Sequence, residues 1–220
     1  MSQIVAASPH VTTKNSTAVI MRDVLIALCP ALIAGCVVFG LRALLVVAVT
    51  TAACIFFEWG YEKLCGKPST ICDLSAAVTG VLLAMNLPVS IPLWQAVFGA
   101  LVAMVAVKGL FGGIGKNFAN PAITARIVMF LAFSKSMTAW VFPDAVSSAT
   151  PLAMMANGES VDYLTLLLGN HGGCLGETSA LALLIGFAYL LIRGVISWHT
   201  PVCFVGTVFV MSLILGLDAV

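Results

Sequence analysis

Long runs of residues without a charged side chain limit what this chain can fold into. Hydrophobic residues make up 61% of its 220 residues and charged residues only 9%, whereas a soluble domain carries about 25% charged residues. A chain this apolar cannot cover a surface that faces water. The runs are long enough for helices that cross a bilayer, so we expect an all-α integral membrane protein.

Seven apolar segments are candidates for membrane-spanning helices, since a span needs about 20 mostly apolar residues. The third segment is short. It opens with Asp73 and Ser75 and stops at Pro88, which predicts a tilted or broken helix. The candidate segments are 22–40, 42–61, 73–88, 93–110, 121–142, 177–193 and 199–217.

The basic residues between these segments predict the orientation of the chain, because Lys and Arg are enriched in cytoplasmic loops. If the spans alternate, only Arg42 lies on the outer side, and the loop 143–170 contains neither Lys nor Arg. The sequence therefore predicts a cytoplasmic N-terminus and an outer location for this loop. The basic residues on the inner side are Lys14, Arg22, Lys63, Lys67, Lys108, Lys116 and Arg193.

Two stretches of the chain resemble each other. Each has an acid, a Ser-Ala step, an apolar helix and a turn with Ser, Trp and Pro, once from Asp73 and once from Glu177. They enter the membrane from opposite sides in the seven-span order, which predicts an inverted repeat; chance similarity of two apolar stretches is the alternative. We therefore expect four parts in the order of the chain: a cytoplasmic N-terminal segment (1–20), a first five-helix repeat (21–142), an outer loop (143–176) and the start of a second repeat (177–220). We expect the chain to be incomplete at its C-terminus.

Composition disfavours several other classes of protein and site. Seven Cys residues are scattered without a Cys-x-x-Cys pair, so neither an iron–sulfur cluster nor a metal site is expected locally. The net charge of +1 gives no electrostatic reason to expect nucleic acid as a partner. Residues 1–18 are mixed and polar, unlike a cleavable signal peptide.

A short polar stretch in the outer loop ends in an accessible hydroxyl, Thr150. The stretch opens with Asp144, and Ser147 and Ser148 are among its small residues. Pro151 favours extended backbone at Thr150, which keeps the hydroxyl off a helix and within reach of a modifying enzyme. This suits a phosphoester between Thr150 and a phosphorylated cofactor; an ordinary Ser/Thr loop is the alternative.

A glycine-rich segment precedes the sixth apolar run. Gly172 and Gly173 lead to Glu177, Thr178 and Ser179. Free N–H groups and the positive end of a helix attract anions, so a flavin phosphate or sugar is a candidate ligand here. The alternative is a simple turn in which Thr178 or Ser179 caps the helix.

The inner loop 111–121 carries two amides, Asn117 and Asn120, three residues apart. On one helical turn both would face the same ligand, and amides suit the donor and acceptor edge of an isoalloxazine ring. Asn120 before Pro121 is equally a plain helix N-cap with Pro at the first helical position.

Charged residues within apolar segments usually face the protein interior and have a partner. Arg126 and Lys135 lie in the fifth segment, where each neutralises an anionic cofactor or partner or simply extends to the interface. Asp73 and Glu177 are expected to be buried or half-buried acids that serve a cation path. Three further charged residues are expected at the interface, namely Glu58, Glu62 and Lys63.

Several motifs in the same order resemble the D subunit of the Rnf electron-transport complex and, more distantly, the B subunit of the sodium-translocating NADH:quinone reductase. The resemblance covers essentially the whole chain. It rests on SPH at 8–10, RDVLIAL at 22–28, GKNFANPA at 115–122, DAVSSATPL at 144–152, GETSALALLIG at 176–186 and ISW at 196–198. The DLSAAVTG segment at 73–80 and the short N-terminus favour the Rnf branch.

The resemblance implies a covalent cofactor. The family attaches FMN through its phosphate to the last Thr of a Ser-x-Ala-Thr motif, which matches Thr150. Ser148 stands where Gly is usual, and Gly adopts backbone angles that Ser does not. The family also holds a second, non-covalent flavin, riboflavin or FMN, toward the cytoplasm, and Asn117 and Asn120 match that place.

The resemblance also implies a fold and a function. The family has about ten helices as two inverted five-helix repeats. Its complex passes electrons between ferredoxin and NAD, couples this to Na⁺ or H⁺ translocation, and joins another flavin subunit and iron–sulfur subunits in the bacterial cytoplasmic membrane. The expected role is an electron relay across the bilayer. A channel or secondary transporter without redox chemistry is the alternative, and a structural scaffold subunit is a third possibility.

Overall fold

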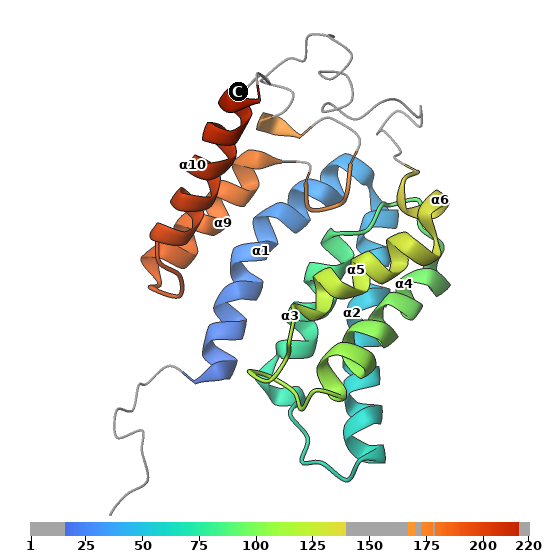
Figure 1. The fold of residues 1–220 in the computed structure, drawn as a ribbon. Coiled ribbons are helices and arrows are strands. Elements are labelled where there is room, and N and C mark those ends of the chain that lie inside the picture. Colours follow the sequence, from blue (N-terminus) through green and yellow to red (C-terminus); the bar gives the residue numbers. More distant parts are fainter. Residues whose placement is uncertain (1–15, 140–166, 170–172, 178, 216–220) are drawn as a thin grey trace, which may run out of the picture.

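The described part of the protein is a bundle of helices joined by turns. The computed structural model describes residues 16–139, 167–169, 173–177 and 179–215, and within them there is no strand. Successive long elements run in alternating directions: α1 rises, α2 descends and α3 rises again in Figure 1. The expectation of an all-α protein is confirmed for these residues.

Two helices are long and apolar enough to cross a membrane. They are α1 (Thr17–Phe39, 23 residues) and α2 (Leu41–Leu64, 24 residues), each about 35 Å long at 1.5 Å per residue against a hydrocarbon core of about 30 Å. Ser16 caps α1 by accepting the Val19 N–H. Gly40, with φ of +71°, makes the tight corner between the two helices, which suits a residue without a side chain.

The other described helices are shorter than a full span, and five of these helical stretches are apolar: Ser75–Met85, Leu93–Gly109, Pro121–Ala132, Ala180–Ile192 and His199–Ile214. The helix of the third segment ends at Met85, three residues before Pro88, so the expected break is confirmed. A continuous helix over 121–142 is wrong, because Phe133 (φ −132°, ψ 44°) interrupts it. The seven-span count remains a prediction. The elements are η1 (Ile71–Asp73), α3 (Ser75–Met85), α4 (Leu93–Leu101), the π-helix η2 (Val102–Gly109), α5 (Pro121–Ala132), α6 (Ser134–Met137), α9 (Ala180–Ile192) and α10 (His199–Ile214).

Small residues let α2, α3 and α5 approach one another closely. A Cβ added to Gly80 of α3 would lie 2.6 Å from the Thr51 Cα of α2, so the two backbones touch at this point. Membrane helices commonly pack through such small residues. The core between these elements includes Ala43, Val46, Leu83, Leu87, Ile91, Ala96, Ala122, Ala125 and Met129.

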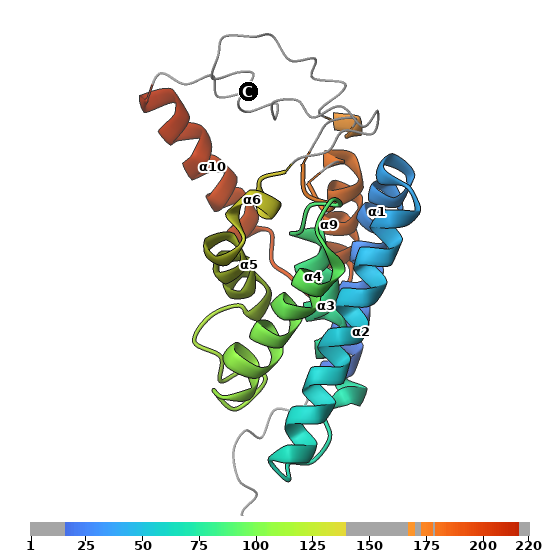
Figure 2. The same ribbon diagram turned by 90° about the vertical axis from the view of Figure 1, so that its right-hand side faces the viewer.

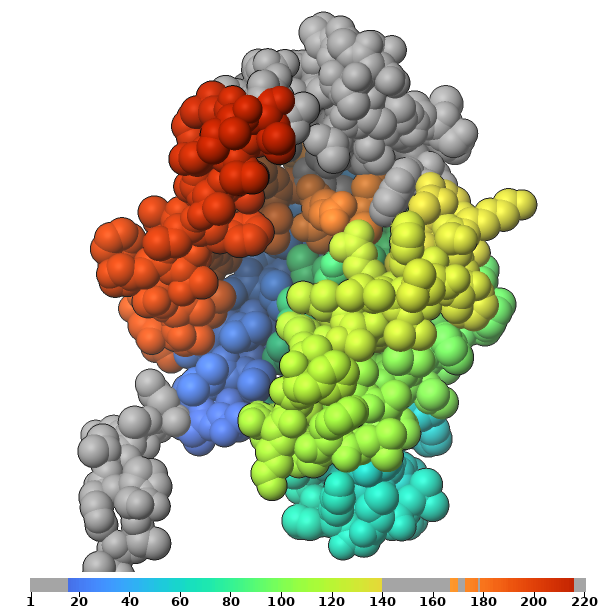
Figure 3. Space-filling view, viewed as in Figure 1, coloured from blue at the N-terminus to red at the C-terminus, as the bar shows by residue number. Residues whose placement is uncertain are grey.

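Helix α9 packs on α1 rather than on the α2–α5 bundle. In Figure 3, α1 lies between α9 and α10 on one side and α3 to α5 on the other. A Cβ at Gly186 would overlap the Ala27 carbonyl oxygen, and Arg193 Nη2 lies 2.9 Å from Asp23 Oδ2. Helix α9 runs opposite to α3 (Figures 1 and 2), as an inverted repeat requires; the repeat itself remains a prediction.

The outer surface of the helices suits lipid rather than water. Helix α10 has no buried residue, and large apolar side chains such as Val37, Phe56, Leu131 and Phe204 are more than 60% exposed. Monomeric soluble proteins rarely expose apolar patches of this extent. The described part of the chain therefore has the surface of a membrane protein.

The contact between α1 and α9 predicts the effect of a single methyl group. Gly186→Ala should lower the thermal unfolding midpoint of the purified protein in detergent, because overpacking costs about 1–3 kcal/mol. Gly206→Ala on α10 is the matched control, since nothing lies within 4 Å of the added Cβ. Equal midpoints for the two variants would contradict the close approach of α9 to α1.

Candidate functional site

Six of the candidate cofactor-binding residues lie outside the described residues. The stretch around Thr150 and two positions of the glycine-rich segment are affected, so their cofactor roles remain predictions. These residues are Asp144, Ser147, Ser148, Thr150, Gly172 and Thr178.

Residues 173–177 form backbone hydrogen bonds with the carbonyl groups at the end of α3. The Leu175 N–H donates to the Leu87 carbonyl at 3.2 Å, and the Gly176 N–H donates to the Met85 carbonyl at 2.8 Å. Gly173 is buried in the same segment. These two N–H groups belong to the segment that was expected to bind an anion. They donate to carbonyl groups instead and are not free for an anionic ligand. Ser179 caps α9 by accepting the Ala182 N–H, as the capping alternative predicted.

Arg126 lies beside this junction and has the partners expected of a charge within an apolar helix. Its Nη1 donates to Asn86 Oδ1 at 2.8 Å, and its Nη2 lies 3.4 Å from Cys174 Sγ. Glu177 Oε1 lies 3.6 Å from Nη1, with 54% of the Glu177 side chain exposed. Glu177 is thus more exposed than predicted. The arginine joins α5, the end of α3 and residues 174–177.

Cys174 is a buried thiol at the centre of this junction. Burial, with Glu177 nearby, outweighs the influence of Arg126 and raises its pKa to about 12. Since the thiolate is the reactive form, Cys174 is protonated and inert at neutral pH. Its role here is packing, because a buried free Cys behaves as a small hydrophobic residue.

The two amides of the loop 111–121, Asn117 and Asn120, have different roles. Asn120 Oδ1 accepts the N–H groups of Ala122 and Ile123 at 3.0 and 3.5 Å, so Asn120 is the N-cap of α5. Asn117 lies before the helix, and the two do not share a helical turn. Asn117 Oδ1 is buried without a hydrogen-bond partner among the described residues. The loop also packs Phe111 against Phe118, with ring centroids 4.6 Å apart.

Lys135 lies on the one-turn helix α6 and is exposed. Within the described residues no carboxylate is close enough to form an ion pair with it. It therefore extends from the end of the helical bundle, and its proposed contact with an anionic cofactor remains a prediction.

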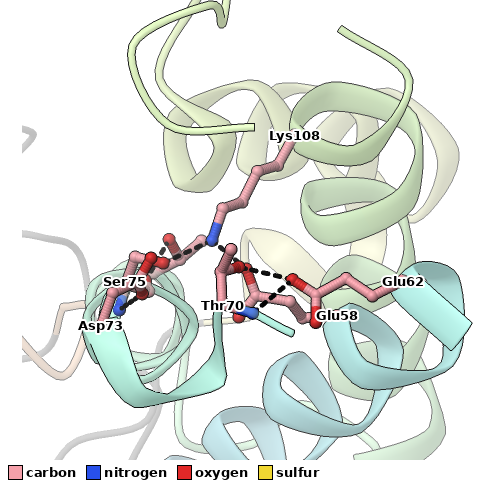
Figure 4. A network of polar contacts seen from close by, with 7 residues as sticks. Glu58, Glu62, Thr70, Asp73, Ser75 and Lys108 are labelled. Carbon is pink, nitrogen blue, oxygen red and sulfur yellow. Dashed lines mark hydrogen bonds and ion pairs between the residues drawn. The ribbon is translucent and has the colours of Figure 1, made fainter. Parts of the chain in front are cut away.

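A buried cluster of polar side chains connects α2, the start of α3 and η2 (Figure 4). Lys108, on the π-helix η2, forms an ion pair with Glu58 of α2 and donates a hydrogen bond to Ser75 Oγ at the start of α3. Glu58 is 5% exposed and Lys108 also 5%. Glu58 and Glu62 are thus buried within the protein near the end of α2, which the sequence did not predict, and Lys108 is not a free charge in a loop. Their depth in the membrane remains a prediction.

The connection between α2 and α3 folds over this cluster. Glu62 Oε1 accepts the Thr70 N–H at 3.0 Å and also the Thr70 hydroxyl, which lies 3.5 Å from Glu58 Oε1 as well. Asp73, half-buried as predicted, accepts the Ser75 N–H at 2.8 Å. A cavity of about 320 Å³ adjoins these groups. Glu58 and Glu62 are four residues apart in an apolar helix, which is the pattern that predicts one shared face.

The buried ion pair predicts a non-additive response to mutation. Lys108→Met should destabilise the protein by about 3–5 kcal/mol, because it leaves the Glu58 carboxylate buried and uncompensated. The double variant Lys108→Met with Glu58→Gln should recover most of that loss. Thermal unfolding in detergent measures both, and the exposed Lys63→Met is the control. Additive losses in the double variant would contradict the pairing.

The burial of Cys174 predicts its reactivity. N-ethylmaleimide at pH 7.5 should modify the exposed residues Cys65 and Cys72 and leave Cys174 unmodified until the protein is denatured. Peptide mass spectrometry after timed labelling measures the three rates. A Cys174 rate equal to that of Cys65 in the folded protein would show that residues 173–177 do not pack as described.

Comparison with known proteins places these features in a family. The model of the NQR2, RnfD, RnfE family matches residues 4–220. The D subunit of the Na(+)-translocating ferredoxin:NAD(+) oxidoreductase complex of Acetobacterium woodii is 45% identical over 98% of this chain and 70% of that protein. The D subunit of the proton-translocating complex of Clostridium ljungdahlii is 35% identical over 96% and 69%. The chain belongs to the NQR2, RnfD, RnfE family.

Proposed function

We propose that this protein is the D-type membrane subunit of an ion-translocating ferredoxin:NAD oxidoreductase complex of the Rnf type. The observation that carries the proposal is the family match over residues 4–220, together with relatives named as the D subunits of such complexes. Two membrane-length apolar helices agree with a subunit embedded in the bilayer. The chain works as one subunit among several and completes no reaction alone.

The proposed chemistry is electron relay by a covalently attached FMN. Thr150 Oγ1 would carry the cofactor through a phosphoester, and Asp144, Ser147 and Ser148 would surround it. FMN supplies one- and two-electron transfer when bound. Support comes from the DAVSSATPL stretch at 144–152 and its resemblance to the family's attachment motif.

In the proposed function, the loop 111–121 would hold a second, non-covalent flavin. The buried Asn117 Oδ1 has no hydrogen-bond partner among the described residues, and a buried acceptor without a donor costs about 1–3 kcal/mol. An isoalloxazine ring has an N–H group that would satisfy it. Asn120 would contribute only its NH₂ group, since its oxygen caps α5.

The proposed topology has seven spans with a cytoplasmic N-terminus in the bacterial inner membrane. It follows from the asymmetry of the basic residues and places Thr150 on the outer side. Burial of Lys108 removes one of the charges that supported this orientation, while six of the seven inner residues remain in the count. Electrons would then pass between an outer flavin and the inner flavin loop.

A channel or secondary transporter without redox chemistry is the competing function. The broken helix α3 and the buried ion pair suit ion passage equally well. The two functions differ in one observable property, which is whether a flavin stays attached to the denatured chain.

The flavin proposal predicts in-gel fluorescence that depends on one hydroxyl. When the wild-type protein is made together with the flavin transferase, its denatured band should fluoresce, and Thr150→Val should abolish the signal. Thr207→Val is the matched control, since Thr207 Oγ1 only donates to the Cys203 carbonyl within α10. A dark wild-type band would exclude covalent FMN and favour the transporter.

A further inference from the structure

One side of α2 is exposed along most of the helix. Exposed residues recur there every three or four positions, the spacing that places side chains on one face of a helix. This face, the α2 stripe, consists of Ala48, Ala52, Phe56, Trp59 and Lys63. The residues of α2 that pack into the protein, such as Thr50, Cys54 and Glu58, lie on the opposite side. Figure 2 shows α2 at the edge of the bundle, so the stripe faces away from the protein.

The α2 stripe is apolar up to its last residue. Phe56 is 61% exposed and Trp59 is 44% exposed, and the centroids of their rings are 6.2 Å apart. Such side chains pack against lipid tails as well as against other apolar side chains. Tryptophan is enriched where the tails meet the headgroups, because its ring is apolar and its N–H is polar. Trp59, one turn before the end of α2, suits that depth.

Lys63 is the single charge of the stripe. It lies in the last turn of α2, and its ammonium is 5.0 Å from the centre of the Trp59 ring. Among the described residues no carboxylate forms an ion pair with it, since the neighbouring Glu62 is buried and accepts the Thr70 N–H. An ammonium has three N–H groups to donate, and the face of a ring does not satisfy them as an anionic oxygen would.

The surface around Lys63 is positive. The two connections at this end of the bundle, 65–74 and 110–120, expose Lys67 and Lys116. Asp73 is the one acid in these connections; it is half-buried and accepts the Ser75 N–H. A negative group at Lys63 would therefore meet attraction from its surroundings and no exposed carboxylate of these two connections.

We propose that the α2 stripe binds one anionic phospholipid, with its phosphate at the Lys63 ammonium and an acyl chain along Phe56 and Ala52. The Trp59 ring lies between the two parts of the lipid, and its indole N–H suits an ester or phosphate oxygen. A zwitterionic lipid with the same acyl chains makes the same apolar contacts, but its own cation offsets the charge of its phosphate. The attraction of one lysine to anionic lipid corresponds to about fivefold in affinity.

Lipid binding measured by native mass spectrometry tests this proposal. The full chain purified in detergent is titrated with dioleoyl phosphatidylglycerol or with dioleoyl phosphatidylcholine, which differ only in the headgroup. We expect the first phosphatidylglycerol to bind the wild type about fivefold more tightly than the first phosphatidylcholine.

Three variants separate the headgroup from the acyl chain. Lys63→Gln should remove most of the preference for phosphatidylglycerol. Lys67→Gln is the matched control, because it loses the same charge at the same end of the bundle from a lysine that also lies over a ring, that of Tyr61, but outside the stripe. Its preference should stay as in wild type. Phe56→Ala should weaken both lipids by similar factors, since it removes an apolar contact and no charge.

Equal affinities of the wild type for the two lipids would overturn the proposal. Equal losses in Lys63→Gln and Lys67→Gln would overturn it too, because they would show a diffuse effect of charge instead of a site. In the native membrane, a photoreactive amino acid in place of Phe56 should crosslink to lipid, whereas a crosslink to another protein would show that a partner chain covers the stripe.

The wild-type comparison decides the proposal even where a variant fails to fold. The lipid site is also independent of the proposed cofactor, so Lys63→Gln should keep the in-gel flavin fluorescence of the wild type. A dark wild-type band with an intact preference for phosphatidylglycerol would contradict the flavin proposal alone.

Discussion

The ion pair between Lys108 and Glu58 holds three elements together at one end of the bundle. Lys108 comes from η2, Glu58 from α2, and Ser75, which accepts from the same ammonium, begins α3. Apolar packing alone positions these helices only loosely, because lipid competes for the same contacts. A charge pair buried away from water offsets its desolvation only when the two groups adopt a favourable geometry, so it fixes the relative position of the helices. The connection 65–74 then folds over the pair through Thr70 and Asp73.

The other organising constraint is the supply of backbone hydrogen bonds where a helix stops inside the protein. Helix α3 ends at Met85, and the carbonyls of Met85 and Leu87 receive N–H groups from Gly176 and Leu175. Broken helices are tolerated at membrane depth when neighbouring protein satisfies the freed groups. Arg126 reinforces the junction through Asn86. Segments about ninety residues apart in sequence thus satisfy each other's backbone hydrogen bonds.

Local chemistry could be predicted from the sequence, and long-range pairing could not. The helical class, the break before Pro88 and the caps Asn120 and Ser179 depend on neighbours within four residues, which the sequence displays directly. The burial of Glu58 and Glu62 was not predicted, because the partners that compensate it come from residues 70 and 108, far along the chain. Thr150 lies outside the described residues, so its role rests on the resemblance alone.

The loop that follows η2 borders the buried polar cluster. Gly112 and Gly113 line the cavity beside Glu58 and Glu62, and Asn117, with its unpartnered oxygen, lies four residues after Gly113. The backbone of this loop therefore connects the buried Lys108–Glu58 ion pair with the one loop amide whose oxygen has no hydrogen-bond partner among the described residues. Coulomb interactions in such a protein interior are several times stronger than in water, so a change of charge near Asn117 would be felt at the ion pair.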